Sequence, residues 1–213
     1  MRQLLVALLI GVCANMAMAA DRALDIAIRQ GDVTAARAAI DAGDAVDIRV
    51  PPFLMTPLAV AAIRGDLAMV RLLLDAGADP NTPGNRGMNA LSAAARSCRA
   101  GPGVIAALID AGANLEDRSG ADLTPLMAAI QEERTDIALQ LIAAGADVDT
   151  RNQYGDGVLN YAIYTRNPAV VQAAMENDVD TSQLNLLFTT DIYYYPGFGH
   201  ARPHAPPDCA ERG

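Results

Sequence analysis

The side chains with the clearest capacity for chemistry lie near the C-terminus. His200 and His204, the two histidines of the chain, are followed closely by Cys209. Imidazole and thiolate groups are ligands for zinc and copper. However, prolines within residues 203–207 prevent the regular helix that would align these groups. We therefore interpret this segment as a solvated tail, and we predict that the protein binds no metal and no cofactor.

The acidic residues offer a second kind of chemistry, since two carboxylates in one pocket can act as general acid and general base. The prominent ones recur at fixed places in a sequence repeat, which indicates a structural role: Asp75, Asp79, Asp110, Asp147 and Asp149. The sequence also has no nucleophile elbow, P-loop, glycine-rich dinucleotide loop or His-Glu zinc helix. We predict that the protein is not an enzyme and has no catalytic residues.

A block marked by a leucine recurs five times at nearly constant spacing and organises most of the chain. The marker residues are Leu24, Leu58, Leu91, Leu126 and Leu159. An alanine follows each leucine three positions later, and four blocks end in a variant of Asp-Ala-Gly-Ala-Asp. A period of about 33 residues is typical of stacked repeats, which build long binding surfaces.

Each block predicts a helix, a turn, a second helix and a loop. In the second block, Thr56 suits the N-cap of a helix and Pro57 its first position. Gly77 ends the second helix in the left-handed conformation that glycine tolerates. The third block has two extra residues in its turn, within 97–103, and in the fifth we expect Asn177 to replace the final glycine.

This pattern resembles the ankyrin family, whose repeat opens its first helix with Thr-Pro-Leu-His-x-Ala. Thr-Pro-Leu occurs twice here, and Ala-Gly-Ala-Asp or Ala-Gly-Ala-Asn three times. The resemblance covers about residues 21–181, and it implies an all-α solenoid of about five helix-turn-helix repeats joined by hairpin-like loops. In the family, the signature histidine helps to tie neighbouring repeats. Its absence here puts some stability in doubt but not the fold, and the residues in its place are Asp25, Ala59, Ser92, Met127 and Asn160.

The N-terminal residues predict export. Arg2 precedes an apolar run over residues 4–12, and Ala17-Met18-Ala19 forms a small-x-small cleavage site. The run is too short for a membrane anchor, which needs about 20 residues. We therefore predict a signal peptide at residues 1–19, an ankyrin-repeat domain at 20–181, and a C-terminal capping segment and tail at 182–213. The expected location is the bacterial periplasm or the outside of the cell.

The composition limits the possible partners. The formal net charge is −9, and a surface of this sign repels phosphate backbones, so we expect no nucleic acid partner. No segment after the N-terminal run is apolar over enough residues to span a membrane. The resemblance instead implies a protein partner of unknown identity, and we expect the chain itself to be a monomer.

In ankyrin proteins, the hairpin tips and the exposed side of the first helices contact partners, so the resemblance supplies candidate residues here. The tips correspond to residues 49–54, 83–87, 118–122 and 151–155, and the first tip is unusual because residues 50–54 are apolar. Such an apolar tip either marks an interface or packs on its neighbour. The candidates at the tips are Phe53, Leu54, Arg86, Arg118 and Tyr154; those on the first helices are Arg29, Arg64, Arg96, Met127, Gln131 and Tyr164.

Two features of the C-terminal region complete the prediction. Cys98 and Cys209 remain after cleavage, and an even pair in an exported protein predicts a disulfide within the chain, with two free thiols or pairing between chains as alternatives. Residues 182–188 predict a short helix that covers the last repeat through Leu184, Leu187 and Phe188. The aromatic residues over 193–198 either meet a partner or fold back on the last repeats, and we favour the second.

Together these features favour a protein-binding module that acts by surface complementarity. Two alternatives belong to other classes. One is a periplasmic inhibitor or immunity protein that blocks a toxic enzyme. The other is a metal- or redox-handling protein that uses the C-terminal tail.

Overall fold

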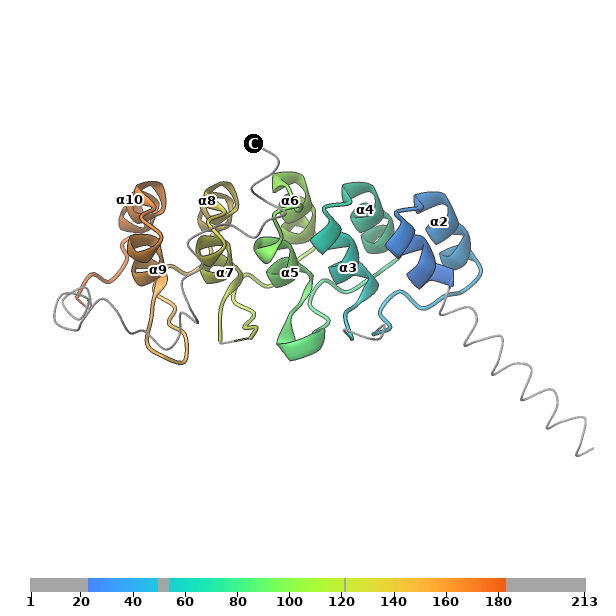
Figure 1. Ribbon diagram of the computed structural model, residues 1–213, viewed down its shortest axis with the longest axis horizontal. Coiled ribbons are helices and arrows are strands. Elements are labelled where there is room, and N and C mark those ends of the chain that lie inside the picture. Colours follow the sequence, from blue (N-terminus) through green and yellow to red (C-terminus); the bar gives the residue numbers. More distant parts are fainter. Residues whose placement is uncertain (1–22, 50–53, 121, 183–213) are drawn as a thin grey trace, which may run out of the picture.

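The computed structural model describes residues 23–49, 54–120 and 122–182, which form a row of stacked helix pairs (Figure 1). In each repeat a first helix lies beside a second helix, and the hairpin loops project from the layer of first helices. After a first helix at residues 23–30, the helices are α2 (Val33–Asp41), α3 (Pro57–Arg64), α4 (Leu67–Asp75), α5 (Ala90–Arg96), α6 (Pro102–Asp110), α7 (Pro125–Gln131), α8 (Thr135–Ala143), α9 (Val158–Tyr164) and α10 (Pro168–Glu176). The predicted all-α repeat solenoid is confirmed.

The first helices begin where the cap residues predict. Thr56 Oγ1 accepts from the backbone N–H of Ala59 at 3.2 Å, and Pro57 occupies the first position of α3. Thr124 caps α7 in the same way, and Asn89 Oδ1 accepts from Ser92 N at 2.8 Å at the start of α5. Because these caps satisfy helix-start amides, α3, α5 and α7 each begin at a defined residue.

The second helices end in a shared backbone conformation. Gly43, Gly77, Gly112 and Gly145 have positive φ angles of 101°, 88°, 84° and 93°. The expectation for the fifth repeat is wrong, because Asn177 has a φ of −107° and Asp178 has a φ of 57°. Asp178 thus takes the left-handed position. It stands as far after Leu159 as Gly145 stands after Leu126, so the fifth repeat has the ordinary length.

The core runs through the whole row between the two helix layers. Leu24, Leu58, Leu91 and Leu126 are fully buried, and Leu159 is only 4% exposed. The alanines that follow three positions later are buried as well, and their small side chains let neighbouring helices approach closely. No repeat can bury these residues alone, so each repeat is stabilised by its contacts with the adjacent repeats.

The enlarged turn of the third repeat, residues 97–101, is held by both neighbouring repeats. Ser97 Oγ donates to the carbonyl of Ile63, and the Arg134 guanidinium donates to the carbonyls of Ser97 and Ala100. A methyl group on Gly65 would overlap the carbonyl oxygen of Arg99. Because backbone occupies that space, the turn requires glycine in the preceding repeat.

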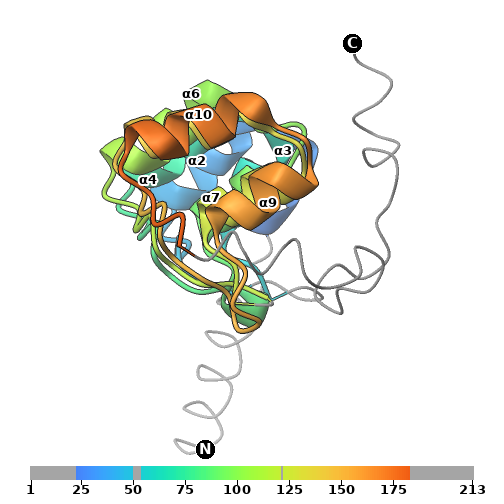
Figure 2. The ribbon, with the colours of Figure 1, turned by 90° about the vertical axis from the view of Figure 1, so that its left-hand side faces the viewer.

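The loops between repeats are hairpins, which overlie one another when the row is viewed along its axis (Figure 2). The third and fourth hairpins contain isolated β-bridges, Ser119 with Leu123 and Arg151 with Gly157. The tip of the second hairpin includes a 3₁₀ turn, Asn85–Gly87. Among the described residues, no helix is long and apolar enough to cross a membrane.

Candidate protein-binding surface

A ladder of carboxylates and amides ties each hairpin base to the next repeat. Each acceptor side chain bonds the backbone N–H of a residue about one repeat later: Asp47 with Asp79 at 3.1 Å, Asn81 with Asn114 at 2.8 Å, Glu116 with Asp147 at 2.8 Å, and Asp149 with Asp180 at 2.6 Å. The donor residues also turn their own loops, since Asp147 Oδ1 accepts from Asp149 N at 2.8 Å. These bonds support the structural interpretation of Asp79, Asp147 and Asp149.

Burial makes one member of the ladder unusual. Glu116 has a pKa raised above its ordinary value, because burial disfavours its charged form more than the bond from Asp147 N favours it. Its second oxygen, Oε2, is buried and has no hydrogen-bond partner in the described part of the chain. Glu116 therefore links the third and fourth repeats at some cost in desolvation.

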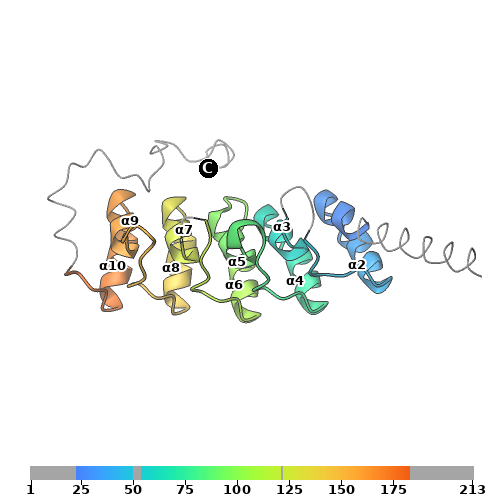
Figure 3. The ribbon, with the colours of Figure 1, turned by 90° about the horizontal axis from the view of Figure 1, so that it is seen from below.

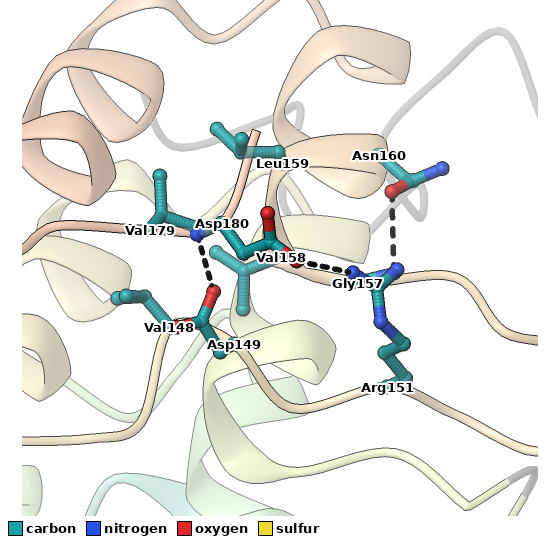
Figure 4. Close-up of a pocket in the computed structure, with 9 residues that line it drawn as sticks. All are labelled: Val148, Asp149, Arg151, Gly157, Val158, Leu159, Asn160, Val179 and Asp180. Atoms are coloured by element: carbon teal, nitrogen blue, oxygen red, sulfur yellow. Dashed lines mark hydrogen bonds and ion pairs between the residues drawn. The ribbon is translucent and has the colours of Figure 1, made fainter. Parts of the chain in front are cut away.

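The last junction of the ladder surrounds a small pocket (Figure 4). Asp149 binds Asp180 N there, and Arg151 lies 4.0 Å from the Asp180 carboxylate. The cavity measures about 10 Å³, which is room for one water at most. This pocket therefore lies at a contact between two successive repeat loops, and it is too small for a ligand.

The fourth hairpin is fixed to α9 by a buried polar network. Asn152 Nδ2 donates to the Tyr161 hydroxyl at 2.9 Å, and Asn152 Oδ1 accepts from the backbone N–H groups of Tyr154 and Asp156. Desolvation raises the pKa of Tyr161 to about 12, so this hydroxyl keeps its proton. The network holds Tyr154 at the hairpin tip in a defined position.

Asp156 is the weak member of this network. It is 3% exposed, its Oδ2 has no hydrogen-bond partner among the described residues, and burial raises the pKa of its carboxyl. The corresponding position, three residues before the marker leucine, holds Met55, Met88 and Leu123 in the preceding repeats. The register of the repeats therefore carries a signal for this buried carboxyl, although Asp156 was not among the expected residues.

The described tip residues differ in how free they are to contact a partner. Leu54 is 51% exposed and Tyr154 48% exposed, and Arg86 is also exposed. Arg118, in contrast, is bonded within the protein: its guanidinium donates to the Asp122 carboxylate at 2.9 Å and to the Arg151 carbonyl at 2.6 Å. Arg118 thus joins the third hairpin to the fourth, so it positions the tips rather than presenting a free cation.

The candidates on the first helices fall into three groups. Arg29 and Arg64 are exposed, and Gln131 and Tyr164 are half-buried. Arg96 is half-buried and pairs with Glu132 of the next repeat at 3.2 Å. The expectation for Met127 is wrong, because Met127 is fully buried. It follows Leu126 directly, and the turn of the helix directs its side chain into the stack.

Several predicted residues lie outside the described part of the chain. These are the signal peptide, Phe53, the tail histidines, the capping segment after Ser182, the aromatic residues over 193–198, and Cys209. Cys98 lies in the enlarged turn of the third repeat and is half-buried. The Cys98–Cys209 disulfide stays a prediction. Within residues 23–49, 54–120 and 122–182, no group of three or more His, Cys, Asp or Glu side chains is arranged to hold a metal ion.

Comparison with known proteins identifies the repeats. A family model described as ankyrin repeats in three copies matches residues 24–119 and again residues 91–185, which together cover most of the chain. The chain belongs to the ankyrin-repeat family. None of the curated proteins matches it. Ankyrin repeats indicate a module for protein–protein interaction, and such repeats are generally not enzymes.

Other polar contacts join the ankyrin repeats where the signature histidines are absent. At those positions Ala59, Ser92 and Met127 are buried, and Ser92 Oγ has no hydrogen-bond partner in the described structure. Asn160 turns back to its own helix start, where its Oδ1 accepts from Gly157 N at 3.3 Å. Polar ties between repeats come instead from the ladder, from the Arg96–Glu132 pair and from the bonds of Arg134.

Proposed function

We propose that this protein captures a partner protein on the surface formed by its hairpin tips and first helices. One observation carries the proposal: Leu54 and Tyr154 each expose about half of their surface at hairpin tips, and the Asn152 bonds hold the tip that carries Tyr154. Tyrosine and arginine are enriched among residues that dominate binding energies, and Tyr154 and Arg86 supply them here. We call Leu54, Arg86 and Tyr154 the tip set.

The second, third and fourth hairpins are connected to one another, which supports binding by a preformed surface. Gly120 N donates to the Arg86 carbonyl at 3.1 Å, joining the second and third tips. Arg118 then joins the third hairpin to the fourth through the Arg151 carbonyl. A surface that is already ordered loses less conformational entropy when a partner binds. The partner would therefore meet a nearly rigid face.

We further propose that the protein acts in the bacterial periplasm or outside the cell, on the strength of the N-terminal sequence. The expected mature chain begins at Ala20, or at Asp21 if cleavage falls one residue later. Intact mass measurement on protein from the producing cell tests this directly. A soluble protein that retains Met1 would contradict the proposed export.

Capture experiments test the proposed surface. Each residue of the tip set is replaced by alanine, together with Phe53→Ala, and each variant is used as bait in periplasmic extract, with bound proteins identified by mass spectrometry. Loss of one dominant contact costs roughly 2 kcal/mol or more, about thirtyfold in affinity. Arg71→Ala is the matched control for Arg86→Ala, because Arg71 is exposed on α4 in the layer of second helices.

Two results decide the proposal. Reduced capture by the tip variants, with Arg71→Ala and the thermal stabilities unchanged, supports it. Unchanged capture by all tip variants refutes the proposed surface. If the captured partner is an enzyme, its activity with and without the ankyrin protein tests the inhibitor or immunity alternative.

A further inference from the structure

The last described repeat exposes apolar side chains that the earlier repeats bury. Four residues after each marker leucine stand Ile28, Ala62, Ala95 and Ile130, which are at most 2% exposed. Ile163 occupies the same position in the fifth repeat and is 44% exposed. This position in the repeat is thus buried in the first four repeats and exposed in the fifth. The helices of the fifth repeat, α9 and α10, lie at the end of the described row (Figure 3).

The second helix of the fifth repeat, α10, shows the same difference in burial. Val171 of α10 corresponds to four residues that are fully buried in the earlier repeats: Ala36, Val70, Ile105 and Ala138. Val171 itself is only partly buried, and with Ile163 it lines an open hollow of about 390 Å³ on α9 and α10. Met175, farther along α10, is 52% exposed. This end face is shaped to receive another layer of the stack.

After the fifth repeat, the backbone makes the same hydrogen-bonded turn that precedes the next repeat elsewhere in the stack. Asp180 N donates to Asp149 Oδ1, as Asp147 N donates to Glu116 one repeat earlier. Asp180 Oδ1 then accepts from Ser182 N at 2.9 Å, as Asp147 Oδ1 accepts from Asp149 N. In the earlier repeats this turn precedes a hairpin and then the next first helix.

The sequence beyond Ser182 keeps the register of the repeats. Ile192 follows Leu159 at the same spacing at which Leu159 follows Leu126, so it stands at the position of the next marker leucine. Thr190 precedes it by two, as Thr56 precedes Leu58 and Thr124 precedes Leu126. The triplet Thr190-Asp191-Ile192 is thus aligned with the Thr-Pro-Leu that starts α3 and α7. Pro196 limits any helix there to little more than one turn.

We propose that residues 183–195 form a sixth, incomplete ankyrin repeat that covers the end face of α9 and α10. In this register Ile192 meets Ile163 and Val171, and it replaces Leu184, Leu187 and Phe188 as the residue expected to cover the last repeat. Because Thr190 and Ile192 keep the register of the repeats, we infer that the occupant is this segment of the same chain. This inference concerns the end of the stack and is independent of the partner-binding surface.

Hydrogen exchange on full-length protein tests the sixth repeat. Ile192→Asp should speed exchange of the α9 and α10 amides about ten- to hundredfold, the effect of exposing one buried isoleucine. Amides of α3 and α5 should keep their wild-type rates. Ala205→Asp is the matched control, because it adds the same charge beyond the proposed repeat, and it should change nothing. Ile192→Val, which keeps the side chain apolar, should retain most of the protection.

Three outcomes would overturn the inference. Equal exchange in Ile192→Asp and wild type would mean that Ile192 covers nothing. Faster exchange in Ala205→Asp as well would mean that charge alone disturbs the end of the stack. Protection of α9 that rises with protein concentration, together with a dimer in sedimentation, would mean that a second copy covers the face.

Discussion

Replacing the buried Asp156 by leucine should stabilise the protein. Asp156 is 3% exposed, and its Oδ2 has no partner among the described residues. A buried polar atom left unpaired costs about 1 to 3 kcal/mol. Leu123 holds the same position in the preceding repeat and is also 3% exposed, so leucine suits this site. The substitution also removes a hydrogen bond with Asn152, and we therefore expect a net gain of about 1 to 2 kcal/mol.

The same carboxyl predicts a pH dependence with a defined sign. Burial raises the pKa of Asp156 above 3.8 in the folded protein. Between 3.8 and the raised pKa, the folded state holds a proton that the unfolded state has released. The contribution of Asp156 to the free energy of unfolding therefore falls as pH rises through this window, and it is level above the folded pKa. Asp156→Leu should remove this fall.

Urea unfolding of wild type and variants across this pH range measures both effects. Asp156→Asn is the control, because it removes the charge but keeps the polar atoms. Asp156→Asn should remove the pH dependence of the free energy of unfolding, but it should stabilise the protein less than Asp156→Leu does. A leucine variant less stable than wild type at neutral pH, or one with an unchanged pH profile, would refute the reasoning about Asp156.

The remaining predictions concern the stack and the cysteines. Gly65→Ala should lower the free energy of unfolding by more than about 1 kcal/mol, since Gly65 has a φ of 71° and a new Cβ would meet the Arg99 carbonyl. Gly145→Ala should lower it by less, because a Cβ there meets no atom within 4 Å. Urea unfolding of the two variants measures the difference. Leu126→Ala should cost roughly 2 to 5 kcal/mol in the same assay, because Leu126 is fully buried. Peptide mapping without reductant should show a Cys98–Cys209 disulfide, and alkylation of both as free thiols in protein from the oxidising compartment would contradict it.

The local elements of the fold were predictable because each depends on residues close in sequence. A helix start depends on Thr56 and Pro57, and a helix end on Gly77, which the structure confirms. The period of the leucines then fixes the stacking of the repeats. The end of the fifth repeat was misplaced at Asn177 because asparagine and aspartate both tolerate a positive φ, and only the register distinguishes Asp178.

The candidate surface was less predictable, because exposure depends on side chains from neighbouring repeats. Arg118 was expected at a partner interface, but its bond to the Arg151 carbonyl depends on the distance between two hairpins. The pairing of Arg96 with Glu132 likewise joins adjacent first helices. Neither contact has a signal in the sequence of a single repeat. The buried Asp156, in contrast, does have one, since its counterparts in repeats two to four are apolar.

Site-specific photo-crosslinking in the producing cell tests the central claim most directly. A photoreactive amino acid replaces Tyr154 at the fourth hairpin tip in one variant and Arg71 on α4 in another, and adducts are identified by mass spectrometry. The proposed surface predicts a discrete protein adduct from position 154 and none from position 71. An adduct from position 71 alone would contradict the claim and place the partner on the layer of second helices.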